Sequence, residues 1–84
     1  MPKKRKGIVQ IRFEILEYLY YNSQPQPRTH VWRKATTLSY DDFIKHLEGL
    51  IEKELVLDKN GDLQISKKGR DTYDKLSQVL FTIL

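Results

Sequence analysis

Residues 39–66 read SYDDFIKHLEGLIEKELVLDKNGDLQIS, which is the pattern of an amphipathic helix followed by a β-hairpin. Ser39 is suited to cap the helix, with Asp42 three residues later completing a variant capping box. We expect the helix to run to about Glu54, with a polar outer face opposite its apolar stripe. The stripe consists of Tyr40, Phe43, Ile44, Leu47, Leu50 and Ile51.

The second half of this stretch predicts a two-stranded hairpin. Residues 55–59 and 62–66 flank Asn60-Gly61, a pair that tolerates positive φ at both central positions of a type I′ turn. Ser66 is then placed to cap a final helix that runs to the C-terminus.

The residues before Ser39 predict two more helices. Residues 8–21 have apolar side chains around more than half of a helix circumference, so either several elements of the domain or a second subunit should cover this helix. Residues 22–27 contain two prolines and are expected to form a stiff polar linker. Thr29 can cap a short helix through about Ala35, and residues 36–38 then form a turn.

This order of elements predicts an α+β, mainly helical fold, the winged helix-turn-helix, with three helices, a two-stranded wing hairpin and a C-terminal helix. At 84 residues the chain is expected to be one compact domain. We divide it into a basic arm (1–7), the winged helix-turn-helix proper (8–66) and a C-terminal helix (67–84) that serves as a dimerisation element.

Several segments also resemble the small archaeal winged-helix DNA-binding proteins. They are Trp32-Arg33-Lys34-Ala35, Leu38-Ser39-Tyr40, residues 47–56 and the step Ile65-Ser66-Lys67-Lys68-Gly69-Arg70, and the resemblance covers roughly residues 8–72. It implies a regulatory or chromatin-associated DNA binder that is a homodimer held by its C-terminal helix. Family members usually have neutral or basic residues where this chain has Asp41-Asp42, and their C-terminal helix is often longer.

Basic residues are concentrated in three places. The chain has 15 Lys and Arg against 11 Asp and Glu, a net charge of +4. Residues 1–12 contain five basic residues and no acid, residues 18–40 contain no acid, and residues 67–70 contain three basic residues. Such arms and patches usually bind a polyanion, most often nucleic acid, because each neutralised phosphate releases counterions. For the arm, a solvated tail and a nuclear import signal at residues 2–6 are the alternatives.

The helix from Ser39 is acidic, which limits base reading. Residues 39–54 carry two lysines and five carboxylates, a net charge of −3, so phosphate should repel much of this helix and sequence preference should be weak. Gly49 within it either allows another backbone to approach or is an exposed position under little constraint. The predicted contacts to double-stranded DNA are Lys3, Lys4, Arg5, Lys6, Arg12, Arg28, His30, Arg33, Lys34, Ser39, Tyr40, Lys45, His46, Lys59, Asn60, Lys67, Lys68 and Arg70.

Several of these contacts have a simpler alternative. The basic residues of 28–34 are placed to bind phosphate, or to form a salt bridge with Asp41 or Asp42 that hides their charge. Lys45 and His46 are alternatively solvated helix positions, and Asn60 is explained by the turn alone. At the level of the whole protein, the alternative function is a protein–protein interaction module that uses the acidic third helix or the apolar C-terminal helix.

The C-terminal helix has an apolar stripe at Tyr73, Leu76, Leu80 and Ile83. This stripe fits either packing against the first helix or a dimer seam. Both of these helices have more apolar surface than one stripe requires, which favours a homodimer because large exposed apolar patches are rare on soluble monomers.

Other classes of function find no support in the sequence. A chain this short has little core for an enclosed catalytic cavity and shows no nucleophile and base arrangement, so we expect no enzyme. No cysteine is present and the two histidines lack partners at ligand spacing, so we expect no metal, no cofactor and no small-molecule ligand. No apolar run reaches the roughly 18 residues of a membrane span. We expect a cytoplasmic, nucleoid-associated protein, or a nuclear one if the chain is eukaryotic.

Overall fold

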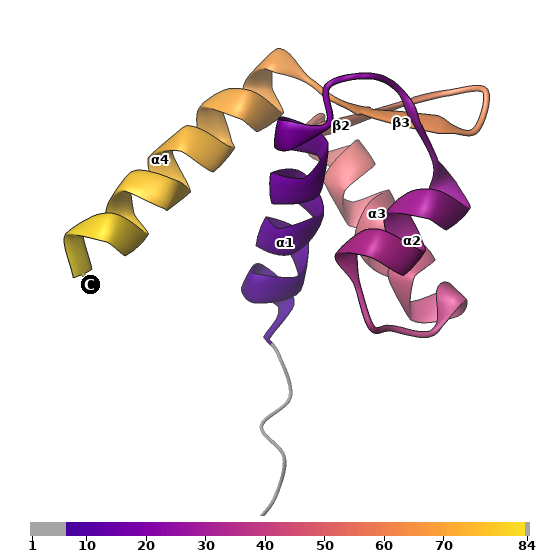
Figure 1. Cartoon of the computed structure of the whole chain (residues 1–84), viewed down its shortest axis with the longest axis horizontal. Helices are drawn as coiled ribbons and strands as arrows, with labels where there is room; N and C mark the ends of the chain where they lie inside the picture. The colour runs from indigo at the N-terminus through magenta and orange to yellow at the C-terminus, as the bar shows by residue number, and fades with distance from the viewer. Residues whose placement is uncertain (1–6, 84) are drawn as a thin grey trace, which may run out of the picture.

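The computed structural model describes residues 7–83, which form four helices and a small antiparallel sheet (Figure 1). In chain order the elements are α1 (Ile8–Tyr21), β1 (Gln26–Pro27), α2 (Arg28–Ala35), α3 (Tyr40–Glu52), β2 (Val56–Lys59), β3 (Asp62–Ile65) and α4 (Lys67–Ile83). In Figure 1, α1 stands in the centre with α2 and α3 on one side and α4 on the other, and the hairpin of β2 and β3 lies across one end. This is the winged helix-turn-helix arrangement that the sequence predicts.

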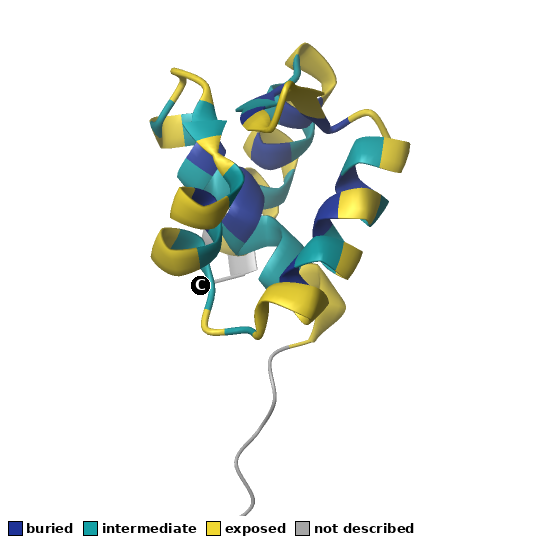
Figure 2. Cartoon of the chain, turned by 90° about the vertical axis from the view of Figure 1, so that its right-hand side faces the viewer, coloured by how far each residue is buried: buried dark blue, intermediate teal, exposed yellow. Residues whose placement is uncertain are grey.

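The core lies between α1, α2, α3 and the hairpin. The bounds of α1 agree with the prediction, and Ile15, Leu16 and Leu19 are buried on it. In Figure 2 the buried positions of the helices turn towards one another and the exposed positions turn outwards. The remaining buried hydrophobic residues among those described are Val31, Phe43, Leu47, Leu50, Leu55, Val56, Leu63, Ile65 and Tyr73.

Both ends of α3 are held by local hydrogen bonds. The Ser39 hydroxyl accepts a bond from the Asp42 amide at 3.2 Å, which confirms the predicted cap. The helix ends at Glu52, two residues earlier than expected, because Glu54 adopts a left-handed φ of 63°. The Glu54 amide donates to Ile51 at 2.9 Å and the next amide donates to the Leu50 carbonyl at 3.0 Å. This closing motif usually has glycine at the left-handed position, and here it directs the chain into β2.

The wing contains the predicted turn and one strand that was not predicted. Asn60 and Gly61 have φ values of 55° and 91°, as a type I′ turn requires. The expected linker contributes β1, which pairs with β3 so that Gln26 lies opposite Leu63 and the sheet order is β1-β3-β2. Pro27 is tolerated because an edge strand has one side free of ladder bonds. The last two residues of the expected linker are thus part of the sheet, which the sequence pattern did not predict.

The start of α2 also differs from the prediction. The helix begins at Arg28 with Pro27 at the capping position, and no side chain caps it, so Thr29 is not the cap. The reason lies in the wing, where the Gly61 carbonyl accepts a bond from the Arg28 amide at 3.3 Å. At the other end of α2, the Trp32 indole donates to the Leu38 carbonyl at 2.7 Å and holds the turn that leads to α3.

The start of α4 packs closely on the end of the wing. The Ser66 hydroxyl accepts a bond from the Gly69 amide at 2.9 Å, which confirms the predicted cap, and donates to the Glu54 carbonyl at 2.6 Å. Gly69 is buried, and a Cβ at this position would overlap the carbonyl oxygen of Leu55. Only glycine allows this approach without a backbone shift.

One aromatic cluster joins α4 to α1. The Tyr73 ring lies 5.0 Å from that of Phe13 and 4.5 Å from that of Tyr20, measured between centroids. Its hydroxyl donates to Glu17 at 2.9 Å, and burial together with this hydrogen bond raises the pKa of Tyr73. Tyr73 is thus an intramolecular core residue, which removes it from the surface that a second copy would meet. Beyond it, α4 diverges from α1 (Figure 1).

Candidate nucleic-acid interface

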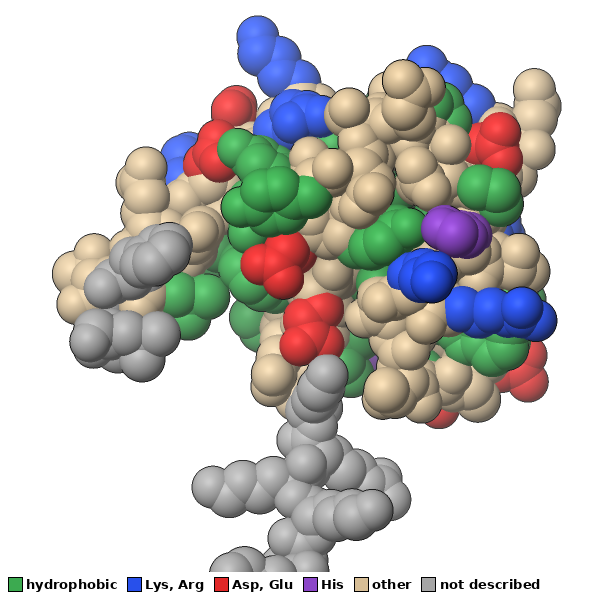
Figure 3. Space-filling view, viewed as in Figure 1, with side chains coloured by type: hydrophobic (Ala, Val, Ile, Leu, Met, Phe, Trp, Pro, Cys, Tyr) green, Lys and Arg blue, Asp and Glu red, His purple; other side chains and the backbone are tan. Residues whose placement is uncertain are grey.

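Helix α2 presents the clearest basic surface among the described residues. It has no acidic residue, and His30, Arg33 and Lys34 are all exposed on it. The Arg33 guanidinium lies 5.9 Å from the centroid of the Trp32 ring, which supports its position. Figure 3 shows histidine and basic side chains gathered over α2, with acidic side chains over the neighbouring α1. An open hollow of about 600 Å³ separates these two groups.

Arg28, at the start of α2, is less exposed than His30, Arg33 and Lys34. It forms an ion pair with Asp58 on β2, and neither Asp41 nor Asp42 is its partner, so that alternative was wrong for this residue. The hydrogen bond between the two side chains raises the pKa of Arg28 and lowers the pKa of Asp58. Sequence analysis missed Asp58, because the pair is separated by 30 positions and no local pattern connects them.

The exposed face of α3 remains acidic in three dimensions. Lys45 is exposed beside Asp41 and Glu48, and all three line an open hollow of about 550 Å³ that extends to the start of α2. The Ser39 hydroxyl is occupied as a helix cap. The Tyr40 ring packs edge-on against Trp32 with centroids 5.3 Å apart. Two basic residues, Arg28 and Lys45, line this hollow. Of the two, Lys45 has no ion-pair partner among the described residues.

Two predicted DNA contacts are turned towards each other between α1 and α3. Arg12 donates from Nε to Nδ1 of His46 at 3.4 Å, and both residues are half-buried. Burial, and then the charge of Arg12, lower the pKa of His46. The Arg12 guanidinium occupies the space above Gly49, so the neighbour of this glycine is a side chain and not another backbone. This placement makes Arg12 and His46 poor candidates for reaching a phosphate.

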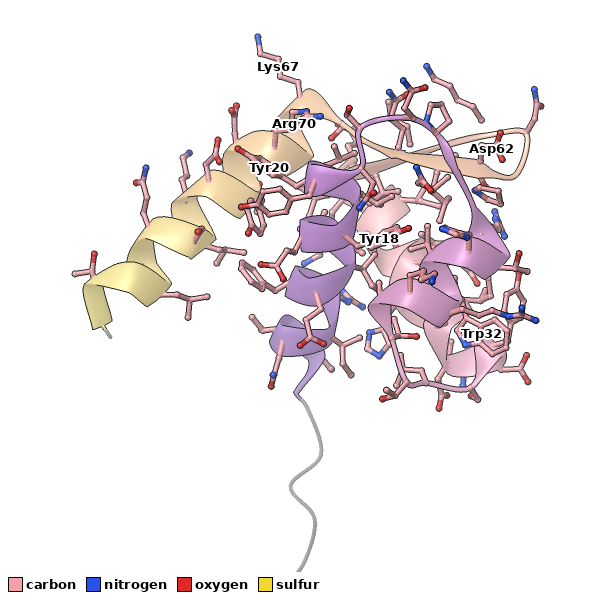
Figure 4. The ribbon with its side chains drawn as sticks, in the orientation of Figure 1. Tyr18, Tyr20, Trp32, Asp62, Lys67 and Arg70 are labelled. Atoms are coloured by element: carbon pink, nitrogen blue, oxygen red, sulfur yellow. The ribbon has the colours of Figure 1, made fainter. Side chains whose placement is uncertain are left out.

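The start of α4 forms a second basic surface. Lys67 and Lys68 are exposed, and Figure 4 shows Lys67 projecting away from the body of the protein. Arg70 lies over the Tyr20 ring at 5.3 Å from its centroid. The Tyr20 hydroxyl donates to Asp74 at 2.8 Å, and this bond raises the pKa of Tyr20. The two lysines are therefore free to reach a partner, whereas Arg70 is held against the protein.

The remaining predicted contacts lie at the wing and in the arm. Lys59 and Asn60 are exposed at the wing. Lys3, Lys4, Arg5 and Lys6 lie outside the described residues.

Within residues 7–83, no group of three or more His, Asp or Glu side chains is arranged to hold a metal ion. No helix in the same range combines the length and apolarity needed to cross a membrane.

Comparison with known proteins agrees with this architecture. A family model described as winged helix-turn-helix matches residues 4–82, a range that includes the wing and all of α4 except its last residue. No curated protein matches the chain.

Proposed function

Because the chain belongs to the winged helix-turn-helix family, we propose that it binds double-stranded DNA, as a transcription regulator or a chromatin-associated protein of the nucleoid. The observation that carries this proposal is the acid-free surface of α2, where His30, Arg33 and Lys34 are exposed. The first helix of a helix-turn-helix crosses the DNA backbone, so cations here would meet phosphate. The arm and the lysines at the start of α4 would add further phosphate contacts.

The acidic face of α3 supports weak sequence preference. Phosphate contacts position a protein on DNA, whereas side chains that reach base edges provide specificity. On α3, Lys45 is accompanied by exposed Asp41, Asp42 and Glu48, which repel the backbone. Such a protein would act by binding and not by catalysis, on DNA of many sequences.

The test is duplex binding measured by fluorescence anisotropy across a range of salt concentrations. Deleting residues 1–6 removes four cations and should flatten the logarithmic salt slope by up to about 3.6. Replacing Arg33→Gln and Lys34→Gln together should flatten it by up to about 1.8. Lys53→Gln removes an exposed cation just after α3 that is neither a predicted DNA contact nor part of the groove between α1 and α4, and it should leave the slope unchanged.

The outcomes separate the two candidate functions. If the shortened protein keeps a substantial salt slope and the α2 variant loses part of it, the folded domain binds phosphate. Binding weaker than roughly 10⁻⁴ M by every form would refute DNA as the partner. The acidic face of α3 would then favour a protein-interaction module that accepts a basic partner.

We propose further that the protein is a homodimer whose copies meet at the groove between α1 and α4. This groove has a volume of about 630 Å³, with Val9 and Phe13 on one wall and Leu76, Val79 and Leu80 on the other. Val9 is 72% exposed and Val79 is 55% exposed, which is unusual for apolar side chains that face each other across a groove. The side chain of Ile83, the last residue of the predicted seam, lies outside the described part of the chain.

Charge favours a second copy as the occupant of the groove. Glu14 and Glu17 line the α1 side of the groove, while exposed Lys75 lies next to the apolar stripe of α4. A partner's α4 would therefore bring both an apolar stripe and a lysine to an apolar groove with acidic residues. Light scattering at about 100 µM should give a dimer mass for the wild type and a monomer mass for Leu80→Asp. Leu57→Asp, at an exposed position of the wing, is the matched control and should remain dimeric, and a monomeric wild type would refute the proposal.

A further inference from the structure

Both carboxylate oxygens of Asp58, in the wing, contact other groups of the protein. Oδ1 accepts a hydrogen bond from the Gly61 amide at 2.9 Å, which holds the turn. Oδ2 pairs with the Arg28 guanidinium, and the side chains of Arg28 and Asp58 are 35% and 22% exposed. The Arg28 amide also donates to the Gly61 carbonyl, so two polar contacts join the start of α2 to the wing.

Arg28 stands where a helix-turn-helix meets the DNA backbone. Its side chain lines the hollow of about 550 Å³ between the start of α2 and the exposed face of α3, together with Tyr40 and Lys45. A guanidinium is a fork of five donors that matches carboxylate and phosphate equally well. Here the carboxylate takes one arm of the fork, and Nε is buried with no hydrogen-bond partner among the described residues. The fork is thus only partly used, at a position that faces the proposed partner.

We propose that Asp58 competes with DNA phosphate for Arg28, and that this internal competitor weakens DNA binding by the folded domain. The inference rests on the proposed function, since it concerns one cation of the proposed interface. A phosphate that takes the Arg28 nitrogen now paired with Asp58 must displace this carboxylate, and the carboxylate then remains close to the phosphate and repels it. Asp58 therefore lowers the affinity of the wing and α2 in two ways.

The decisive variant is Asp58→Asn. Asparagine keeps an oxygen that can accept the Gly61 amide bond, so the turn is preserved, while the charge that holds Arg28 is lost. Asp62→Asn is the matched control, because Asp62 is also an exposed carboxylate of the wing (Figure 4) and its removal changes the net charge equally. Arg28→Ala is made alone and in combination with Asp58→Asn, so that the four proteins form a double-mutant cycle.

The competition predicts changes in both the affinity for duplex DNA and the salt slope. Partly exposed ion pairs are weak, so Asp58→Asn should tighten binding about two- to fivefold more than Asp62→Asn does. Release of Arg28 to a phosphate should steepen the logarithmic salt slope by about 0.9. In the Arg28→Ala background, Asp58→Asn should tighten binding no more than Asp62→Asn does in the wild type. Arg28→Ala should accordingly weaken binding more when Asp58 has been replaced.

Failure of the inference and failure of the proposed function give different results. If Asp58→Asn and Asp62→Asn have equal effects, or if the gain survives without Arg28, the competition is refuted and DNA binding stands. If no protein of the cycle binds DNA, both the competition and the proposed function are overturned. Circular dichroism of each variant establishes that its helices are intact. If Asp58→Asn alone loosens the wing, the effect of Arg28→Ala on DNA affinity, compared between the wild type and the Asp58→Asn protein, still tests the competition.

Discussion

The buried glycine at the start of α4 provides a prediction whose sign depends on tertiary structure. In a helix, alanine is favoured over glycine by up to about 1 kcal/mol, so propensity alone says that Gly69→Ala stabilises the protein. The structure gives the opposite expectation. A Cβ at Gly69 would overlap the backbone oxygen of Leu55 and lie 2.7 Å from Cγ1 of Ile65.

The expected cost follows from the atoms that have to move. Inserting a methyl group into a packed site costs about 1 to 3 kcal/mol. The Leu55 oxygen also accepts a bond from the Ser66 amide at 3.1 Å, and moving the oxygen would weaken that bond, at a cost of about 1 kcal/mol. After subtraction of the propensity gain, Gly69→Ala should lower the free energy of unfolding by about 2 kcal/mol. For a domain of this size that lowers the melting temperature by about 8 to 16 °C.

Gly49→Ala is the matched control, because it makes the same substitution within a helix. A Cβ at Gly49 would meet the Arg12 guanidinium, with Nη2 at 2.5 Å, which is the far end of a flexible side chain that can move aside. The propensity gain of up to about 1 kcal/mol is then offset only by the loss of the long Arg12 to His46 hydrogen bond. We expect the free energy of unfolding to remain unchanged or to rise by less than about 1 kcal/mol.

Urea unfolding of the wild type and both variants, followed by circular dichroism at one protein concentration, measures these differences. The fixed concentration matters because association would shift the apparent stability. The reasoning is refuted if Gly69→Ala is as stable as the wild type, or if the two variants lose equal stability.

Three further predictions concern single side chains. The substitution Glu54→Gly, at a position with a left-handed backbone conformation, should raise the free energy of unfolding by about 1 kcal/mol in the same urea assay. The reason is that glycine adopts a positive φ without a Cβ clash, and a loss of stability would contradict this. Folding lowers the pKa of His46 from 6.5, so the unfolded chain binds the proton more readily than the folded protein does. The melting temperature should therefore fall as the pH drops below about 6.5, whereas His46 should contribute no pH dependence above that value. The melting temperature of His46→Gln should depend less on pH. Tyr73→Phe removes the hydroxyl that donates to Glu17 but keeps the ring contacts, and should cost about 1 to 2 kcal/mol by urea unfolding, with no change expected if that hydrogen bond is unimportant.

Elements whose signals are local were predictable from the amino-acid sequence. The bounds of α1 follow from its apolar pattern, and the caps at Ser39 and Ser66 lie within three residues of the amides they bind. The Asn60-Gly61 turn is equally local, because the two residues that need positive φ are the two that tolerate it. The separation of a basic α2 from an acidic α3 is also a property of the sequence, since consecutive helices carry the two charges.

Tertiary structure alone decided which of these charges face outwards. Arg28 and Asp58 are 30 positions apart, Arg12 and His46 are 34 apart, and Tyr73 and Glu17 are 56 apart. A charge or an apolar stripe read along the chain does not reveal such partners, because the packing of the helices on the wing sets them. For the same reason β1 was missed, since its two residues become a strand only where β3 offers a free edge. Local patterns along the chain thus specify the four helices, the wing hairpin and their charges, while packing places Arg12 and His46 inwards, joins Tyr73 to the core and holds Arg28 against the wing.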